Sequence, residues 1–127
     1  MSDDGPLRIA VERTGTTVRV AAEGEIDIST VERLREATSR ELAADGEIVV
    51  VDLTHVSFID SSGLHAVLDA ASRAPQRLRI IPGAVALTLF TITGVADRLP
   101  LVENHADNGL RPHRLGNLNG GESGPGD

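Results

Sequence analysis

"VDLTHVSFIDSSGLHAVLDA" (residues 51–70) passes from an apolar, β-branched run into a segment with apolar residues at helical spacing. The apolar run begins with EIVVVDL at 47–53, which is typical of a strand covered on both faces or central in a parallel arrangement. The helical segment, GLHAVLDAASRA at 63–74, ends before Pro75. This succession predicts an α/β fold, and its junction carries one carboxylate, two hydroxyls and a glycine: Asp60, Ser61, Ser62 and Gly63.

The residues before this stretch predict a β-hairpin followed by a helix. Apolar and polar residues alternate over 7–27, and the hairpin is expected to turn around Gly15. A helix is expected over 28–46, where Ser29 and Glu32 fit a capping box. In a capping box each of the two side chains satisfies a free backbone N–H group at the start of the helix.

The residues after it predict three short elements: a strand at 77–82, a helix at 84–94 and a last strand within 95–103. The helix is expected to end at Gly94 and to place three apolar residues on one face: Val85, Leu89 and Ile92. We therefore predict a single small α/β domain with the order β-β-α-β-α-β-α-β. Its helices are expected to pack on a mixed β-sheet of four to five strands.

The character of the chain changes after this last strand. From Asn104 onward the sequence is rich in Gly, contains Pro and scattered charges, and has no apolar periodicity. Such a segment buries too little apolar surface to offset the entropy of ordering. We predict that residues 6–103 form the domain and that residues 104–127 form a flexible C-terminal tail.

Composition excludes several classes of function. The formal net charge of −7 and the 2% of aromatic residues argue against nucleic acids and anionic membranes as partners. The chain lacks Cys and all 12 basic residues are Arg, which excludes zinc–thiolate sites, thiol catalysis, Walker-type phosphate loops and Schiff-base lysines. No apolar run approaches the ~18 residues of a membrane span, and the acidic N-terminus does not resemble a signal peptide. We expect a cytoplasmic protein without a metal or other cofactor.

Four roles are open to the junction: helix cap, nucleophile, phosphate cradle and phosphate acceptor. Ser61 or Ser62 can cap the free N–H groups at the start of the helix. A nucleophile is disfavoured because Ile59 replaces the first Gly of G-x-S-x-G, and a cradle is disfavoured because there is no Lys. Gly63 is expected to leave space for another molecule to approach, and a helix N-terminus tolerates a phosphate. The residues thus favour a cap or a phosphate acceptor, and we assign no catalytic residue.

Three blocks of the sequence resemble the STAS-domain anti-sigma-factor antagonists. FIDSSGL at 58–64 is similar to the most characteristic segment of that family, and EGEIDISTVERLREA at 23–37 is similar to the segment around the start of its first helix. AVALTLFTITGV at 84–95 resembles its late helix. The blocks occur in the order and spacing of the family and cover roughly residues 7–103.

The resemblance implies a regulatory switch and not an enzyme. In that family the Ser directly after the Asp is phosphorylated by a partner serine-protein kinase that is also the anti-sigma factor, and this position is Ser61 here. The unphosphorylated protein binds the anti-sigma factor and frees a sigma factor. The phosphorylated protein dissociates from the anti-sigma factor, and a phosphatase removes the phosphate again. The resemblance further implies a set of partner-binding residues, in which Ser62 also caps the helix: Asp27, Asp60, Ser62, Gly63 and Leu64.

Two points are left open by the sequence. His65 stands where the family commonly has Gly, and it is either a solvated helix residue or a specificity contact. The alternative function is a STAS scaffold or ligand-sensing module that is not regulated by phosphorylation.

Overall fold

The computed structural model describes residues 5–44, 48–105 and 109–112. The observed order begins as predicted, β-β-α-β-α-β-α, and continues with a short 3₁₀ helix and two strands. The elements are β1 (Leu7–Thr14), β2 (Thr17–Ile26), α1 (Val31–Ala43), β3 (Ile48–Ile59), α2 (Ser61–Arg73), β4 (Leu78–Ile81), α3 (Gly83–Ile92), the 3₁₀ helix η1 (Ala96–Arg98), β5 (Val102–His105) and β6 (Gly109–Pro112).

A mixed four-stranded sheet forms the centre of the domain, in the order β1-β2-β3-β4. The first two strands form the predicted antiparallel hairpin, in which Thr14 pairs with Thr17 and Gly15 turns the chain at a φ of 61°. β3 is parallel to both of its neighbours, which is one of the two arrangements that its apolar sequence indicated. All three parallel strands therefore end at the same edge of the sheet.

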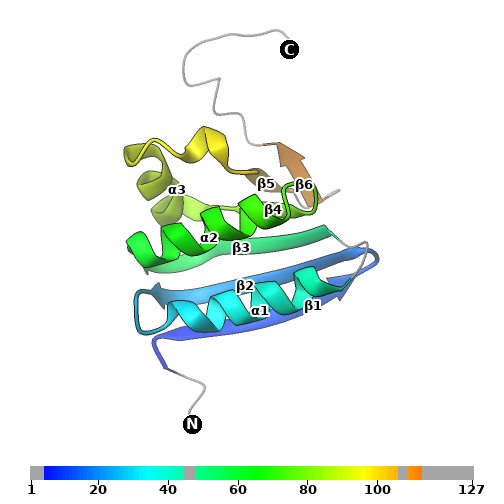
Figure 1. Ribbon diagram of the computed structural model, residues 1–127, viewed down its shortest axis with the longest axis horizontal. Coiled ribbons are helices and arrows are strands. Elements are labelled where there is room, and N and C mark those ends of the chain that lie inside the picture. The colour runs from blue at the N-terminus through cyan, green and yellow to red at the C-terminus, as the bar shows by residue number, and fades with distance from the viewer. Residues whose placement is uncertain (1–4, 45–47, 106–108, 113–127) are drawn as a thin grey trace, which may run out of the picture.

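The helices α1 and α2 lie next to each other on one face of the sheet (Figure 1). Alternate residues of β3, namely Val49, Val51 and Leu53, point into the core on this face and pack with buried residues of both helices, such as Leu34 and Val67. Val50 belongs to a second, smaller apolar cluster. Because β3 contributes to both clusters, an uninterrupted apolar sequence suits it better than an alternating one.

Three elements differ from their predicted form. β3 continues beyond residue 53 as far as Ile59, because its last residues pair with the end of β2. The helix α3 turns Ala86 and Phe90 into the core, whereas Val85 and Ile92 of the predicted apolar face are exposed and only Leu89 of that face packs against the core. The segment expected to be a tail contains the second half of β5 and all of β6, which pair antiparallel. Residues 113–127 of that segment lie outside the described residues.

Candidate functional site

The carboxyl ends of β2 and β3 bring two aspartates to the same edge of the sheet. Ile26 and Ile59 are paired across these parallel strands, and the N–H of Asp60 donates to the carbonyl of Ile26 at 3.2 Å. Asp27 and Asp60 each follow one of the paired residues. α2 begins directly after Asp60, and α1 begins at Val31, after a short loop that starts at Asp27. The N-termini of both helices therefore lie at this edge (Figure 1).

Asp60 is the N-cap of α2. Its Oδ1 accepts from the backbone N–H of Ser62 at 2.9 Å and from the Ser62 hydroxyl at 2.5 Å. The expectation that Ser62 caps the helix is therefore wrong, because Asp60 supplies the capping oxygen and Ser62 supplies the donors. Aspartate is among the strongest N-cap residues, since its side-chain oxygen satisfies N–H groups that the helix leaves free.

The two serine hydroxyls of the junction are held differently. Ser61 is the first residue of α2, and its side chain is exposed. Within the described residues, no hydrogen bond of the Ser61 hydroxyl is found, whereas the Ser62 hydroxyl is half-buried and bonded to Asp60. Of the two adjacent hydroxyls, Ser61 is the one that another protein can reach without first breaking a contact of this chain.

Gly63 and Leu64 lie inside the fold. A Cβ added at Gly63 would lie 2.6 Å from Ile59 Cγ1 and 2.8 Å from Ile26 Cγ2, and Leu64 is only 7% exposed. The expectation that Gly63 opens space for a partner is wrong, since the chain's own isoleucines occupy that space. Gly63 instead allows the first turn of α2 to approach the ends of β2 and β3, and Leu64 anchors that turn in the core.

Asp27 organises the loop between β2 and α1. Its Oδ1 accepts from the Ser29 hydroxyl at 2.7 Å, from the Ser29 N–H at 2.9 Å and from the Thr30 N–H at 3.2 Å. The predicted capping box is wrong, because the Ser29 N–H is bonded to Asp27, and the N-cap residue Thr30 uses its hydroxyl elsewhere, donating to the Glu25 carbonyl at 2.9 Å. The hydrogen bonds from the hydroxyl and the N–H of Ser29 are the main reason that the pKa of Asp27 lies below its ordinary value of 3.8. Burial opposes this lowering, and the hydrogen bonds from Thr30 add to it by smaller amounts.

The lowered pKa of Asp27 predicts a pH dependence of stability. A carboxyl whose pKa is lower in the folded state stabilises the protein fully above its unfolded-state pKa and loses that contribution as the pH falls through the folded-state value. Asp27→Asn removes the titration, so the free energy of unfolding should fall less between about pH 5 and about pH 2 than in the wild type. Urea denaturation at a series of pH values measures this difference.

The donor side provides the matched comparison for this experiment. Ser29→Ala removes the hydrogen bond from the Ser29 hydroxyl to Asp27 and keeps the Asp27 carboxylate, so it should remove only part of the pH dependence. An Asp27→Asn protein that loses stability with acid as steeply as the wild type would show that the loop does not depend on the charge.

One short pattern recurs at three positions and was missed in the sequence. Asp27, Asp52 and Asp60 are each followed two residues later by Ser or Thr. In every case Oδ1 of the aspartate accepts from both the N–H and the hydroxyl of that residue, at distances of 2.5–2.9 Å. This is the local geometry in which an Asp side chain replaces a backbone turn. At Asp60 this pattern could have assigned the helix cap to the aspartate, whereas Asp52 lies within β3 and Asp27 precedes the N-cap Thr30 of α1.

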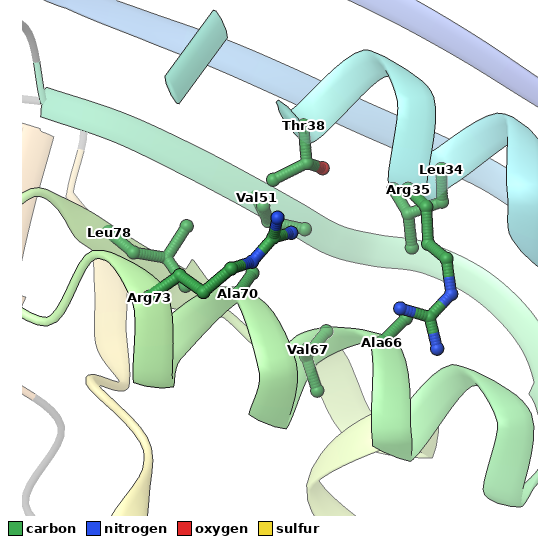
Figure 2. Close-up of a pocket in the computed structure, with 9 residues that line it drawn as sticks. All are labelled: Leu34, Arg35, Thr38, Val51, Ala66, Val67, Ala70, Arg73 and Leu78. Atoms are coloured by element: carbon green, nitrogen blue, oxygen red, sulfur yellow. The ribbon is translucent and has the colours of Figure 1, made fainter. Parts of the chain in front are cut away.

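The seam between α1 and α2 contains a cavity of about 10 Å³, enough for about one water molecule (Figure 2). Its floor is Val51 of the sheet, and small residues such as Ala66 and Ala70 line it, while Arg35 and Arg73 extend along its sides. No residue of the Ser61 junction lines it. The cavity is therefore a packing gap between two helices and is separate from the candidate site.

The described part of the chain also sets limits on other kinds of site. Within residues 5–44, 48–105 and 109–112, no three His, Asp or Glu side chains are grouped in a way that could hold a metal ion. No helix among the described residues has the length and apolar character needed to cross a membrane.

Fold and site together define a small α/β domain in which an accessible serine hydroxyl stands on the first residue of a helix that is capped by an aspartate. The family model of the STAS domain matches residues 8–108, and the chain belongs to this family. Two curated relatives are the anti-sigma-B factor antagonists of Listeria monocytogenes and Listeria innocua. Each is 32% identical over 90 residues, which cover 68% of this chain and 79% of the relative.

Solved structures show the same fold. An anti-sigma factor antagonist from Mycobacterium paratuberculosis superimposes with a TM-score of 0.71 at 24% identity, covering 85% of this chain and 94% of that one. The anti-sigma factor antagonist SpoIIAA in its unphosphorylated form gives a TM-score of 0.60 at 21% identity, covering 78% and 90%. These comparisons confirm the predicted fold class and the resemblance to the STAS-domain anti-sigma-factor antagonists.

Proposed function

We propose that this protein is an anti-sigma-factor antagonist that is switched by phosphorylation of Ser61. In the unphosphorylated form it binds an anti-sigma factor that is also a serine-protein kinase, and the sigma factor is thereby freed. Phosphorylation of Ser61 by that kinase releases the complex, and a phosphatase restores the unphosphorylated form. The protein acts in the cytoplasm as a binding partner and substrate, without an enzymatic activity of its own.

The observation that carries this proposal is the difference between the two hydroxyls of the junction. Ser61 is exposed and its hydroxyl has no partner among the described residues, whereas the Ser62 hydroxyl donates to Asp60 at 2.5 Å. Transfer requires that the Ser61 oxygen form a bond to the γ-phosphorus of ATP, while its proton passes to a base of the kinase and ADP leaves. Only an accessible hydroxyl can take the in-line position that this step needs.

The surroundings of Ser61 favour a protein as the partner. Ile28 directly follows Asp27 and is 80% exposed, and Phe58, two residues before Asp60, is 48% exposed. Large apolar side chains that protrude beside a polar site are typical of protein–protein contacts. Asp27, Asp60 and Ser62 belong to the proposed contact surface directly, whereas Gly63 and Leu64 support it from within the fold.

Phosphate transfer from a candidate kinase tests the proposal. The unphosphorylated protein is incubated with ATP and each anti-sigma kinase encoded in the same genome, and the product is mapped by mass spectrometry. We expect one phosphate, on Ser61, and its loss in Ser61→Ala.

Ser62→Ala is the matched control, because it removes the neighbouring hydroxyl and keeps the Ser62 N–H that Asp60 binds. It should still be phosphorylated on Ser61. Phosphate on Ser62 in the wild type, or none from any of these kinases, would contradict the proposal.

A further inference from the structure

His65 lies one helical turn after Ser61 on the outer side of α2. Both side chains are exposed, and they stand at positions i and i+4 of the same helix. Side chains with this spacing are neighbours, with about 5–6 Å between their Cβ atoms. A phosphate on the Ser61 hydroxyl would therefore lie within reach of the imidazole.

Few of the acidic side chains near His65 are free to compete with such a phosphate for the imidazole. His65 lines a groove together with Arg35 of α1, Asp69 of α2 and Arg98 of η1. Asp69 is bound by Arg35 at 3.3 Å, and Arg35 also lies 3.6 Å from Glu32. The helix α3 carries no charged side chain. Asp69 and Glu32 are thus already paired with Arg35, and the exposed Asp97 of η1, next to Arg98, does not line the groove.

The carboxylate nearest in sequence to Ser61 is also engaged. Asp60 directs Oδ1 to the N–H and hydroxyl of Ser62, and the first turn of α2 contains no acidic residue. On the cationic side, the guanidinium of Arg98 forms no ion pair or hydrogen bond with the described residues. His65 and Arg98 are therefore the two groups of the groove that could bind a new negative charge. Only His65 shares the helix of Ser61 at the spacing that places side chains together.

We infer that His65 is the intramolecular partner of phosphorylated Ser61. This inference rests on the proposed function and names a regulation of the same site. The phosphate carries about −1.5 to −2 charges at pH 7, and histidine as a residue type changes its charge between about pH 5 and 8. An imidazole N–H of His65 donates to the phosphate and holds it against α2, one helical turn from its own position.

The test places phosphoserine at position 61 by amber-codon suppression, so that no kinase is needed. The ³¹P resonance of the phosphoserine is followed between about pH 5 and about pH 8, in the wild type and in His65→Gln. A protonated histidine favours the dianion, so the titration midpoint of the phosphate should be lower in the wild type by about 0.3 pH units or more. If no kinase phosphorylates Ser61, the proposed function is contradicted, but the ³¹P titration of the phosphoserine protein can still be measured.

Arg98→Gln separates the two cations of the groove. We expect it to retain the wild-type midpoint, because the effect is assigned to the residue one turn along α2. Identical midpoints in the wild type and His65→Gln, or a change confined to Arg98→Gln, would overturn the inference.

Discussion

Gly63→Val is expected to lower the free energy of unfolding by about 3 kcal/mol, the upper part of the usual range for overpacking a core. Gly63 is buried, and even a Cβ at this position would lie 2.6–2.9 Å from side-chain atoms of Ile26 and Ile59. Both isoleucines belong to the core and cannot swing into solvent. Removal of a helical glycine returns only a few tenths of a kcal/mol, which does not offset the clash.

Urea denaturation measures this loss, and circular dichroism shows whether α2 still forms. Gly5→Val is the control, because an added Cβ at Gly5 meets nothing within 4 Å; its midpoint should equal that of the wild type. A Gly63→Val protein that is as stable as the wild type would show that the start of α2 does not pack on the strand ends as described.

The repetitive parts of the fold could be predicted because their patterns are periodic. The alternation over residues 7–27 predicted the hairpin, and the β-branched run at 47–53 predicted a strand that is either covered on both faces or central in a parallel arrangement. Helix α3 is an element for which periodicity did not predict the buried face. Its sequence, GAVALTLFTI, is apolar around most of its circumference, so periodicity cannot select the face that contacts β3. Contacts with the rest of the domain select Ala86 and Phe90 instead.

The candidate site was located by sequence, but the roles of its members were not. The junction after β3 and the acceptor position Ser61 could be named from the order of residue types. The capping residues could not be named in this way, because the side chains of Ser, Thr and Asp can all accept hydrogen bonds from the N–H groups at a helix start. Which of them caps the helix depends on the geometry of the loop. Gly63 was misjudged for a similar reason: sequence shows that a side chain is missing, but only the packing shows what fills the space.

Phosphoserine at position 61 is expected to weaken binding to the anti-sigma factor about a hundredfold, which corresponds to about 3 kcal/mol. The argument rests on the proposed function and on the position of Asp27 and Asp60, which put two carboxylates at the edge of the sheet that carries Ser61. A partner that covers this edge removes water from the phosphate beside like charges. In the free protein the phosphate stays in water at the positive end of α2, so the domain itself should remain folded.

Isothermal titration of the purified anti-sigma factor against the phosphoserine protein measures the change in Kd. The matched control carries the same phosphoserine at Ser72, which is exposed on α2 about three turns from Ser61. It adds the same charge to the same helix and should bind like the unphosphorylated protein, as should Ser61→Ala. An equal loss from both phosphoserine positions would mean that net charge alone weakens the complex. A loss confined to position 61 places the switch at the junction of β3 and α2, where burial converts an added charge into release.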